Sequence, residues 1–337
     1  METGFRSLVH HTAVHWAAVS YLECFNMASV ICGSVAYDTI MTFDGHFREH
    51  ILPDKIHILN VSFLVPTMRR EFGGCAGNIA FTLKMLGGDP IIMGTVGQDA
   101  GPYLDYLQKL GISTAHVTEV PDTFTAQAMI TTDRDNNQIT AFHPGAMSHS
   151  SINSVKNALP ARLGLVGPDS REGMLHHAKQ FAESGVPFIF DLGQAMPLFD
   201  GADLRHFVEL ASYVVVNDYE AQVMLSRTGY SAAELAQRVE AYIVTRGEEG
   251  AEIYAGGKQY TIPAVPAERV VDPTGCGDAF RGGLLYGIEN GLDWDTTGRL
   301  ASLMGSLKIA CQGPQNHGLP VDEIARRFES AFGYRYQ

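Results

Sequence analysis

The sequence predicts an α/β protein in which helices cover both faces of a mainly parallel sheet. From Ser29 onward, short apolar runs alternate with helix-like segments, and this alternation is typical of such a sheet. The chain has 337 residues, 45% of them hydrophobic and 18% charged, which is enough apolar material to bury one large core or two unequal ones. A paired segment without a covering helix interrupts the pattern and indicates a second, smaller sheet.

Six apolar runs are the candidate strands of the large sheet. Strands that are buried on both faces are continuous apolar runs, because neither face meets water. The candidates are Val30–Cys32, Ile91–Thr95, Leu163–Val166, Phe188–Phe190, Tyr213–Val216 and Tyr242–Val244.

Helices are expected between these strands. The segments Asn78–Leu86 and Gly173–Glu183 are each followed within two residues by glycine, the residue that most often ends a helix. Ser231, with Glu234 three residues later, has the spacing of a capping box and predicts another helix start.

The paired segment without a covering helix lies in the first half of the chain. Thr125–Thr132 and Gln138–His143 are strand-like and flank a polar turn, so they predict a hairpin. The extended-looking segment Ile56–Val65 is expected to join it. These segments predict a small sheet that stands off the main domain as a lid, in two stretches near 39–72 and 121–145.

Residues 1–26 are expected to be an N-terminal extension outside the fold, with residues 27–337 forming the domain. Histidines interrupt the weak apolar pattern of this extension, and it would make a poor signal peptide.

Charge and cysteine content exclude several classes of protein. The net charge of −13 argues against binding to nucleic acid or to an anionic membrane, because both need clustered Lys and Arg. The five cysteines are scattered without CxxC spacing, which fits a reducing cytoplasm better than a disulfide framework or a zinc site. No apolar run approaches the ~20 residues needed to cross a bilayer. We therefore expect a cytoplasmic protein that binds neither nucleic acid nor membrane.

The strongest chemical signal is the run Asp272–Phe280. Gly275, Cys276 and Gly277 stand at a predicted helix start, where free backbone N–H groups and the helix dipole favour an anion such as phosphate. Asp278 would lie beside that anion and accept the proton of an attacking hydroxyl. The alternative is a glycine-rich helix start at which the dipole simply favours the Asp278 carboxylate.

A second group of residues suits a polyhydroxyl ligand. Gly73 and Gly74 open a helix and permit close approach of a ligand, and Asn78 offers donors and acceptors for hydroxyls. Asp38 follows the first strand and is expected at the carboxyl end of the sheet, where open α/β folds bind their ligands. A tight turn with Asn78 as helix cap, and a solvent-facing Asp38, are the structural alternatives.

Two further strands end in polar residues at the same edge. Asn217 and Glu220 supply oxygen atoms suited to a hydrated Mg²⁺, or form a capping box with each other. Thr245 and Gly247 follow the next strand and would touch ATP phosphates, or make a turn.

With these elements in this order, the chain resembles the ribokinase-like carbohydrate kinase family, also called the PfkB family. The two family signatures fall on residues 73–97 and 272–280, and the similarity runs from about Ser29 to the C-terminal region. The resemblance implies a ribokinase-like three-layer α/β/α sandwich with a β lid. It also implies an enzyme that transfers a phosphoryl group from ATP, with Mg²⁺, to an alcohol group of a small molecule.

The resemblance assigns roles to the candidate residues. The catalytic residues it implies are Asp278 as the base and Gly275, Cys276 and Gly277 as the anion hole. The substrate-binding residues are Asp38, Gly73, Gly74 and Asn78. The residues for ATP and water-bound Mg²⁺ are Asn217, Glu220, Thr245, Gly247, Gly275, Gly277 and Gly313.

A monovalent cation site is also implied near the C-terminus. The segment Gly313–Gln315 looks like the family's loop beside adenine and a monovalent cation, with Asp272 contributing to the cation site. Pro314 and His317 replace the commoner small residues, so dependence on K⁺ is left open.

Within the family, the segment Asn60–Pro66 looks most like bacterial adenosine or nucleoside kinases. An apolar lid strand carrying Phe63 would cover a flat nucleobase, although ordinary packing of the lid explains the same residue. We therefore expect phosphorylation of the 5′-hydroxyl of a ribonucleoside, most of all adenosine. The alternative is a sugar kinase of the ribokinase or fructokinase type.

Other classes fit less well. A non-catalytic ligand-binding regulator of the same fold would not need Asp278 and its glycines. The glycines near it do not complete GxGxxG, and no GxxxxGK[ST] occurs, which disfavours a dehydrogenase and a Walker-type ATPase.

The expected partners are a small substrate and ATP. An exposed lid edge would pair two subunits or be shielded by charge, so monomer and homodimer both remain open.

Overall fold

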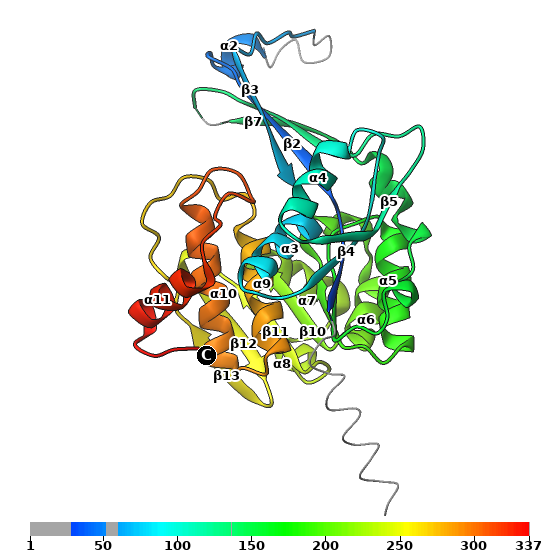
Figure 1. The fold of residues 1–337 in the computed structure, drawn as a ribbon, viewed down its shortest axis with the longest axis vertical. Coiled ribbons are helices and arrows are strands. Elements are labelled where there is room, and N and C mark those ends of the chain that lie inside the picture. Colours follow the sequence, from blue (N-terminus) through cyan, green and yellow to red (C-terminus); the bar gives the residue numbers. More distant parts are fainter. Residues whose placement is uncertain (1–27, 52–59, 136, 337) are drawn as a thin grey trace, which may run out of the picture.

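The computed structural model describes residues 28–51, 60–135 and 137–336, which form a large and a small sheet (Figure 1). The large sheet has nine strands in the order β13-β12-β11-β10-β9-β8-β1-β4-β5, and only β12 and β13 run antiparallel to their neighbours. Its strands are β1 Ser29–Cys32, β4 Pro90–Val96, β5 Ser113–Glu119, β8 Leu163–Val166, β9 Phe188–Asp191, β10 Tyr213–Asn217, β11 Ala241–Thr245, β12 Ala251–Ala255 and β13 Lys258–Ile262. All six predicted strands are confirmed.

Helices cover both faces of this sheet. One face packs against α3 Cys75–Met85, α4 Gly101–Lys109, α9 Cys276–Glu289, α10 Trp294–Ile309 and α11 Val321–Phe332. The other packs against α5 Arg171–Glu183, α6 Gly201–Leu210, α7 Asp218–Thr228 and α8 Ala232–Ala236. Neighbouring strand residues alternate between the two cores, since Ile31 belongs to the first and Val30 to the second. The predicted three-layer α/β/α sandwich is therefore confirmed.

The small sheet extends away from these layers, with α2 Phe47–His50 at its far end (Figure 1). Its strand order is β3-β2-β6-β7, made of β2 Ala36–Thr42, β3 Thr67–Gly73, β6 Ala126–Thr132 and β7 Gln138–His143. The predicted β6–β7 hairpin is present and antiparallel. Short 3₁₀ helices complete the fold at Gly145–Ile152, Val155–Ala158, Gly193–Leu198 and Gly247–Glu249.

The prediction of a strand at Ile56–Val65 is wrong for the part of this segment that the structure describes. Residues 60–65 form no strand, and 56–59 lie outside the described residues. The strand that pairs with β2 is β3, whose middle carries Arg69, Arg70 and Glu71. No apolar alternation marks β3, because no helix layer covers the outer face of the small sheet and its side chains stay partly exposed.

Helix starts also differ from the prediction. Helix α3 begins at Cys75 rather than Asn78, with Gly74 as its N-cap residue, so Asn78 lies inside the helix and does not cap it. Helix α5 begins at Arg171, two residues before the predicted start, because Ser170 caps it by accepting a hydrogen bond from the Gly173 N–H. The predicted capping box of Ser231 and Glu234 is present at α8.

No helix in the described ranges has both the length and the apolar character that crossing a membrane requires.

Candidate active site

The amino end of α9 has backbone N–H groups without acceptors among the described residues. Gly275 is its N-cap residue, with φ +82°, a conformation that favours glycine, and no side chain caps the helix. In the hydrogen bonds of the described residues, the N–H groups of Gly277 and Asp278 have no acceptor. Free N–H groups at the positive end of a helix dipole can bind an anion, so Gly277 and Asp278 are the candidate donors of the cradle. Cys276, which was predicted to contribute, instead donates its N–H to the Pro273 carbonyl at 3.2 Å.

Asp278 lies in the first turn of α9, beside this cradle, and is half-buried. Its Oδ2 accepts a hydrogen bond of 2.7 Å from Asn78 Nδ2. Burial raises the pKa of the Asp278 carboxyl to about 6; the Asn78 hydrogen bond opposes this rise, whereas the charge of Asp191 adds to it. A carboxylate with a pKa near 6 is deprotonated at neutral pH and still basic enough to accept a proton.

Asn78 is itself held by a chain of hydrogen bonds. Its Oδ1 accepts from Gln315 Nε2 at 2.9 Å, and Gln315 Nε2 also donates to the Tyr103 hydroxyl at 2.6 Å. The Tyr103 hydroxyl donates to the Gly73 carbonyl at 2.7 Å. Both polar atoms of the Asn78 amide thus have protein partners, and α3 is tied to the loop before α11. Tyr103 was not predicted to contribute, and Gln315 was predicted only as part of the loop beside adenine, because the bonds of Gln315 to Asn78 and Tyr103 join residues more than 200 positions apart.

Asp38 lies in strand β2 of the small sheet rather than in a turn at the end of the large sheet. Its carboxylate lies against Gly73, where a Cβ atom would be 2.6 Å from Asp38 Oδ2. Burial raises the Asp38 pKa to about 6, and the charges of Asp272 and Glu71 add to the rise. Asp38 also raises the pKa of Asp278, so the two carboxylates act on each other electrostatically.

A buried ion pair behind the cradle was not predicted. Arg281 binds Asp191 through two hydrogen bonds, Nε to Oδ2 at 3.0 Å and Nη2 to Oδ1 at 2.9 Å. Arg281 Nη1 also donates to the Gly277 carbonyl at 3.3 Å, so the pair fixes the first turn of α9 to the end of β9. The signal in the sequence was a basic residue, Arg281, inside the mainly apolar helix α9.

One exposed aromatic residue lies on the same face of the small sheet as Asp38. Residues paired across strands share a face, and the pairing places Glu71, Asp38, Ala128 and Phe142 in one row. Phe142 is 53% exposed, and Ala128 between it and Asp38 is small. Phe142 is two strands from Asp38, about 10 Å at the usual strand spacing. Sequence reasoning missed Phe142 because its strand is exposed along its whole length.

Phe63, which was expected to cover the base, packs into an aromatic cluster at the tip of the small sheet. Its ring centroid lies 4.9 Å from that of Phe43 and 5.0 Å from that of Phe47. The ordinary-packing alternative therefore describes its contacts, and its role toward a nucleobase stays a prediction.

A model of the family described as "pfkB family carbohydrate kinase" matches residues 34–322, which contain every element of this site. The chain belongs to the pfkB family of carbohydrate kinases. It is 30% identical over 272 residues to a nucleoside kinase of Methanocaldococcus jannaschii, covering 80% of this chain and 89% of the relative. It is 26% identical to a ribokinase of Bacillus subtilis, covering 86% of this chain and 95% of the relative.

Two solved structures agree with the fold. The nucleoside kinase of Burkholderia thailandensis in complex with inosine is 62% identical, with a TM-score of 0.84, covering 91% of this chain and 99% of that one. The same kinase with ADP-inosine is 63% identical, with a TM-score of 0.82, covering 91% and 97%.

Asn217 and Glu220 form the capping box that was the structural alternative for them. Asn217 Oδ1 accepts from the Glu220 N–H at 2.7 Å, and Glu220 Oε2 accepts from the Asn217 N–H at 2.8 Å. Glu220 Oε1 takes part in no hydrogen bond of the described residues. One carboxylate oxygen and the partly exposed Asn217 thus have the chemistry to hold a Mg²⁺ ion through water.

Thr245 and Gly247 follow the neighbouring strand at the same edge. Thr245 pairs in register with Asn217, and Gly247 begins an exposed 3₁₀ turn with φ +55°. The structure therefore brings these residues to the carboxyl end of the sheet, as predicted.

Asp272 and Gly313 are joined by a hydrogen bond. The Gly313 N–H donates to Asp272 Oδ2 and the Thr274 N–H to Oδ1, each at 2.9 Å. Burial alone would raise the pKa of Asp272, but these hydrogen bonds outweigh it and lower the pKa.

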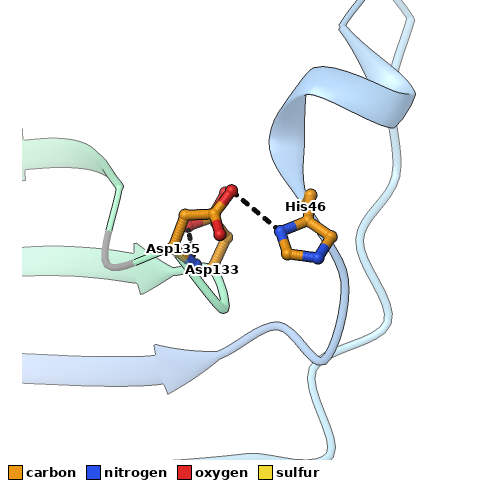
Figure 2. Close-up of side chains that lie close together, drawn as sticks. All are labelled: His46, Asp133 and Asp135. Atoms are coloured by element: carbon orange, nitrogen blue, oxygen red, sulfur yellow. Dashed lines mark hydrogen bonds and ion pairs between the residues drawn. The ribbon is translucent and has the colours of Figure 1, made fainter.

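A separate cluster of possible metal ligands, His46, Asp133 and Asp135, lies at the tip of the small sheet (Figure 2). His46 Nδ1 lies 2.9 Å from Asp135 Oδ2. Both oxygens of Asp133 already accept hydrogen bonds, from the N–H groups of Phe47, Asp135 and Asn137 and from the Asn137 amide. This cluster therefore ties α2 to the β6–β7 turn and is not part of the active site.

Proposed function

We propose that this chain is an ATP-dependent ribonucleoside kinase that phosphorylates the 5′-hydroxyl of its substrate. The observation that carries the proposal is Asp278, beside the free N–H groups of the α9 cradle and in electrostatic contact with Asp38. The similarity to nucleoside kinases, including one solved with inosine, supports a nucleoside rather than a free sugar.

The residues divide the reaction between them. Asp38, with Gly73 beside it, binds neighbouring ribose hydroxyls, because a carboxylate accepts two hydrogen bonds. Asp278 accepts the proton of the 5′-hydroxyl as that oxygen attacks the γ-phosphorus of ATP. The N–H groups of Gly277 and Asp278 stabilise the charge on the transferred group. When bound at Asn217 and Glu220, Mg²⁺ would neutralise phosphate charge.

The small sheet acts as the lid of this site. The face that carries Asp38 also carries Glu71, whose Oε2 accepts a hydrogen bond of 3.2 Å from Asn316 Nδ2 in the loop after α10. That face is therefore turned toward the loop that contains Asn316. Phe142, at the far end of the same row, would stack on the base. Closure of the lid over the nucleoside excludes water from the phosphoryl transfer.

Adenosine is the substrate that we propose first, and inosine is the second because the similar Burkholderia kinase is solved with it. A turnover panel with MgATP and adenosine, inosine, guanosine, ribose and fructose tests the proposal. We expect higher kcat/KM for a purine ribonucleoside than for either sugar. A preference for ribose or fructose would replace the proposal with a sugar kinase.

A further inference from the structure

Lys308 is a fully buried lysine beside the turn that begins at Asp272 and the loop that follows α10. Its relative exposure is 0%, and lysine is almost never buried completely unless its ammonium is paired. The ammonium donates to the Asp272 carbonyl at 2.6 Å and to the Cys311 carbonyl at 3.1 Å. In the described part of the chain, no carboxylate lies within ion-pair distance of it.

One of these carbonyls belongs to the turn before the anion cradle, and the other to the loop after α10, whose Pro314 lies against Gly275. Asp272 begins the turn that leads to Gly275, the N-cap residue of α9. Cys311 follows α10 and leads to Gly313, whose N–H binds the Asp272 carboxylate. Lys308 lies in the last turn of α10, where the helix dipole favours a positive charge. A single ammonium therefore holds the two loops together from behind the cradle.

The family resemblance implies a monovalent cation at this place, with Asp272 contributing to its site. Such an ion would need oxygen ligands, for which carbonyl groups are the usual choice for K⁺. Here the Asp272 and Cys311 carbonyls already bind an ammonium of the same charge. Both carboxylate oxygens of Asp272 accept backbone N–H groups. His317 replaces a small residue and is 3% exposed, with its Nε2 3.1 Å from the Thr82 hydroxyl oxygen. The residues do not fit a bound K⁺ ion.

We propose that the Lys308 ammonium is a tethered replacement for the monovalent cation, so that this kinase works without K⁺. Lys308 is a positioning residue: it touches neither substrate, and it acts by fixing the Asp272 turn and by placing a positive charge behind the N–H groups of the cradle. The proposal rests on membership of the pfkB family and on ATP binding, and it does not depend on which alcohol is phosphorylated.

The test compares the wild type, Lys308→Ala and Lys308→Met at constant ionic strength with KCl, NH₄Cl or choline chloride. ADP release is measured with the best substrate of the panel, and the melting temperature with and without MgATP is measured in each salt. Lys258→Met, a change of an exposed lysine on edge strand β13, is the matched control.

The wild type should keep the same kcat in choline and in K⁺, within about two-fold. Lys308→Met should lose roughly 10- to 100-fold in kcat, as expected when hydrogen bonds from a charged group are removed. Lys308→Ala, which leaves the carbonyls free and a space between them, should regain part of the loss in K⁺ or NH₄⁺ but not in choline. A purely structural role for Lys308 predicts no such new dependence on the cation.

Activation of the wild type by K⁺ of more than about five-fold over choline would overturn the inference even if neither variant folds. So would a folded Lys308→Met with wild-type kcat, or a folded Lys308→Ala that no cation improves. If the wild type turns over no nucleoside or sugar, the ribonucleoside kinase proposal fails. The inference is then still tested by whether K⁺ changes the stabilisation of the wild type by MgATP.

Discussion

Burial and the neighbouring polar groups set the pKa of the Asp278 carboxyl. A general base acts only when deprotonated, so kcat/KM should rise with pH through about 6 and be lost below it. The Asp38 carboxyl has a pKa of about 6 as well, so in the wild type this limb belongs to the pair of carboxylates.

Replacing Asn78 with Ala removes the hydrogen bond donated to the charged form of Asp278. Because that bond lowers the pKa of Asp278, the acidic limb of the kcat/KM profile should move to higher pH in Asn78→Ala. The measurement is kcat/KM from pH 5 to 8 for both proteins. A limb that stays in place or moves to lower pH would show that Asp278 does not set it.

Arg281 is predicted to be essential for stability as well as for the site. Arg281→Ala leaves the Asp191 carboxylate buried without its partner, which should lower the free energy of unfolding by about 3–5 kcal/mol. Arg171→Ala breaks the much more exposed pair with Asp203 and should lower the free energy of unfolding far less, because water screens that pair. Urea denaturation measures both. Equal losses in the free energy of unfolding would mean that the buried ion pair contributes no more to stability than the exposed pair.

Among single residues, those whose chemistry depends on a local motif could be predicted from the sequence. Asp278 and its glycines are adjacent in the chain, so their contact could be predicted. The partners of Arg281 and Asn78 could not, because Asp191 and Gln315 lie 90 and 237 positions away and no spacing rule joins them.

Elements that are buried on both faces were predictable, and exposed elements were not. The central strands β1, β8 and β10 are continuous apolar runs, since helices cover both faces. Strand β3 carries charged residues along its middle, and the apolar segment before it belongs to an aromatic cluster rather than to a strand. The pattern of a sheet without a second helix layer is therefore the harder one to recognise.

The junction of β3 and α3 depends on Gly74. It has φ +83°, and a Cβ there would lie 2.5 Å from the Ser34 carbonyl oxygen and 2.7 Å from the Ala36 nitrogen. These are backbone atoms of the β1–β2 connection, so they cannot move without displacing Asp38. We expect Gly74→Ala to reduce kcat/KM strongly and to destabilise the fold by more than the ~1–2 kcal/mol of left-handed strain alone.

Gly87→Ala is the matched control for Gly74→Ala. Gly87 has φ +92° but nothing within 4 Å of its added Cβ, so this variant suffers the strain without the clash. Its kcat/KM should be unchanged. Melting temperatures and kcat/KM are measured for both variants, and equal effects on the two would contradict the role of the close contact at Gly74.

For the whole molecule, the prediction that residues 1–26 lie outside the fold concerns residues outside the described ranges and stays a prediction. A chain that starts at Met27 should keep its kcat and should unfold within about 0.5 kcal/mol of the full chain. Calorimetry and the ADP-release assay measure this. A larger loss would place the extension within the fold.

In the proposed reaction the two sheets share one site: α9 beside the large sheet carries the phosphate cradle and Asp278, and the small sheet carries Asp38. Substrate choice was less predictable than the reaction, because the proposed contact with the base involves the exposed side chain of Phe142, and only the strand pairing of the small sheet places Phe142 in the row of Asp38.

The most direct measurement is single-turnover phosphoryl transfer by the wild type and by Asp278→Asn, with MgATP and adenosine or inosine. Mass spectrometry and ³¹P NMR identify the product, and calorimetry gives the nucleoside Kd of each protein. We expect the wild type to form the nucleoside 5′-monophosphate, and Asp278→Asn to react at least about 10²- to 10⁴-fold more slowly with little change in Kd. A product phosphorylated elsewhere, or near-normal transfer by Asp278→Asn, would contradict the account.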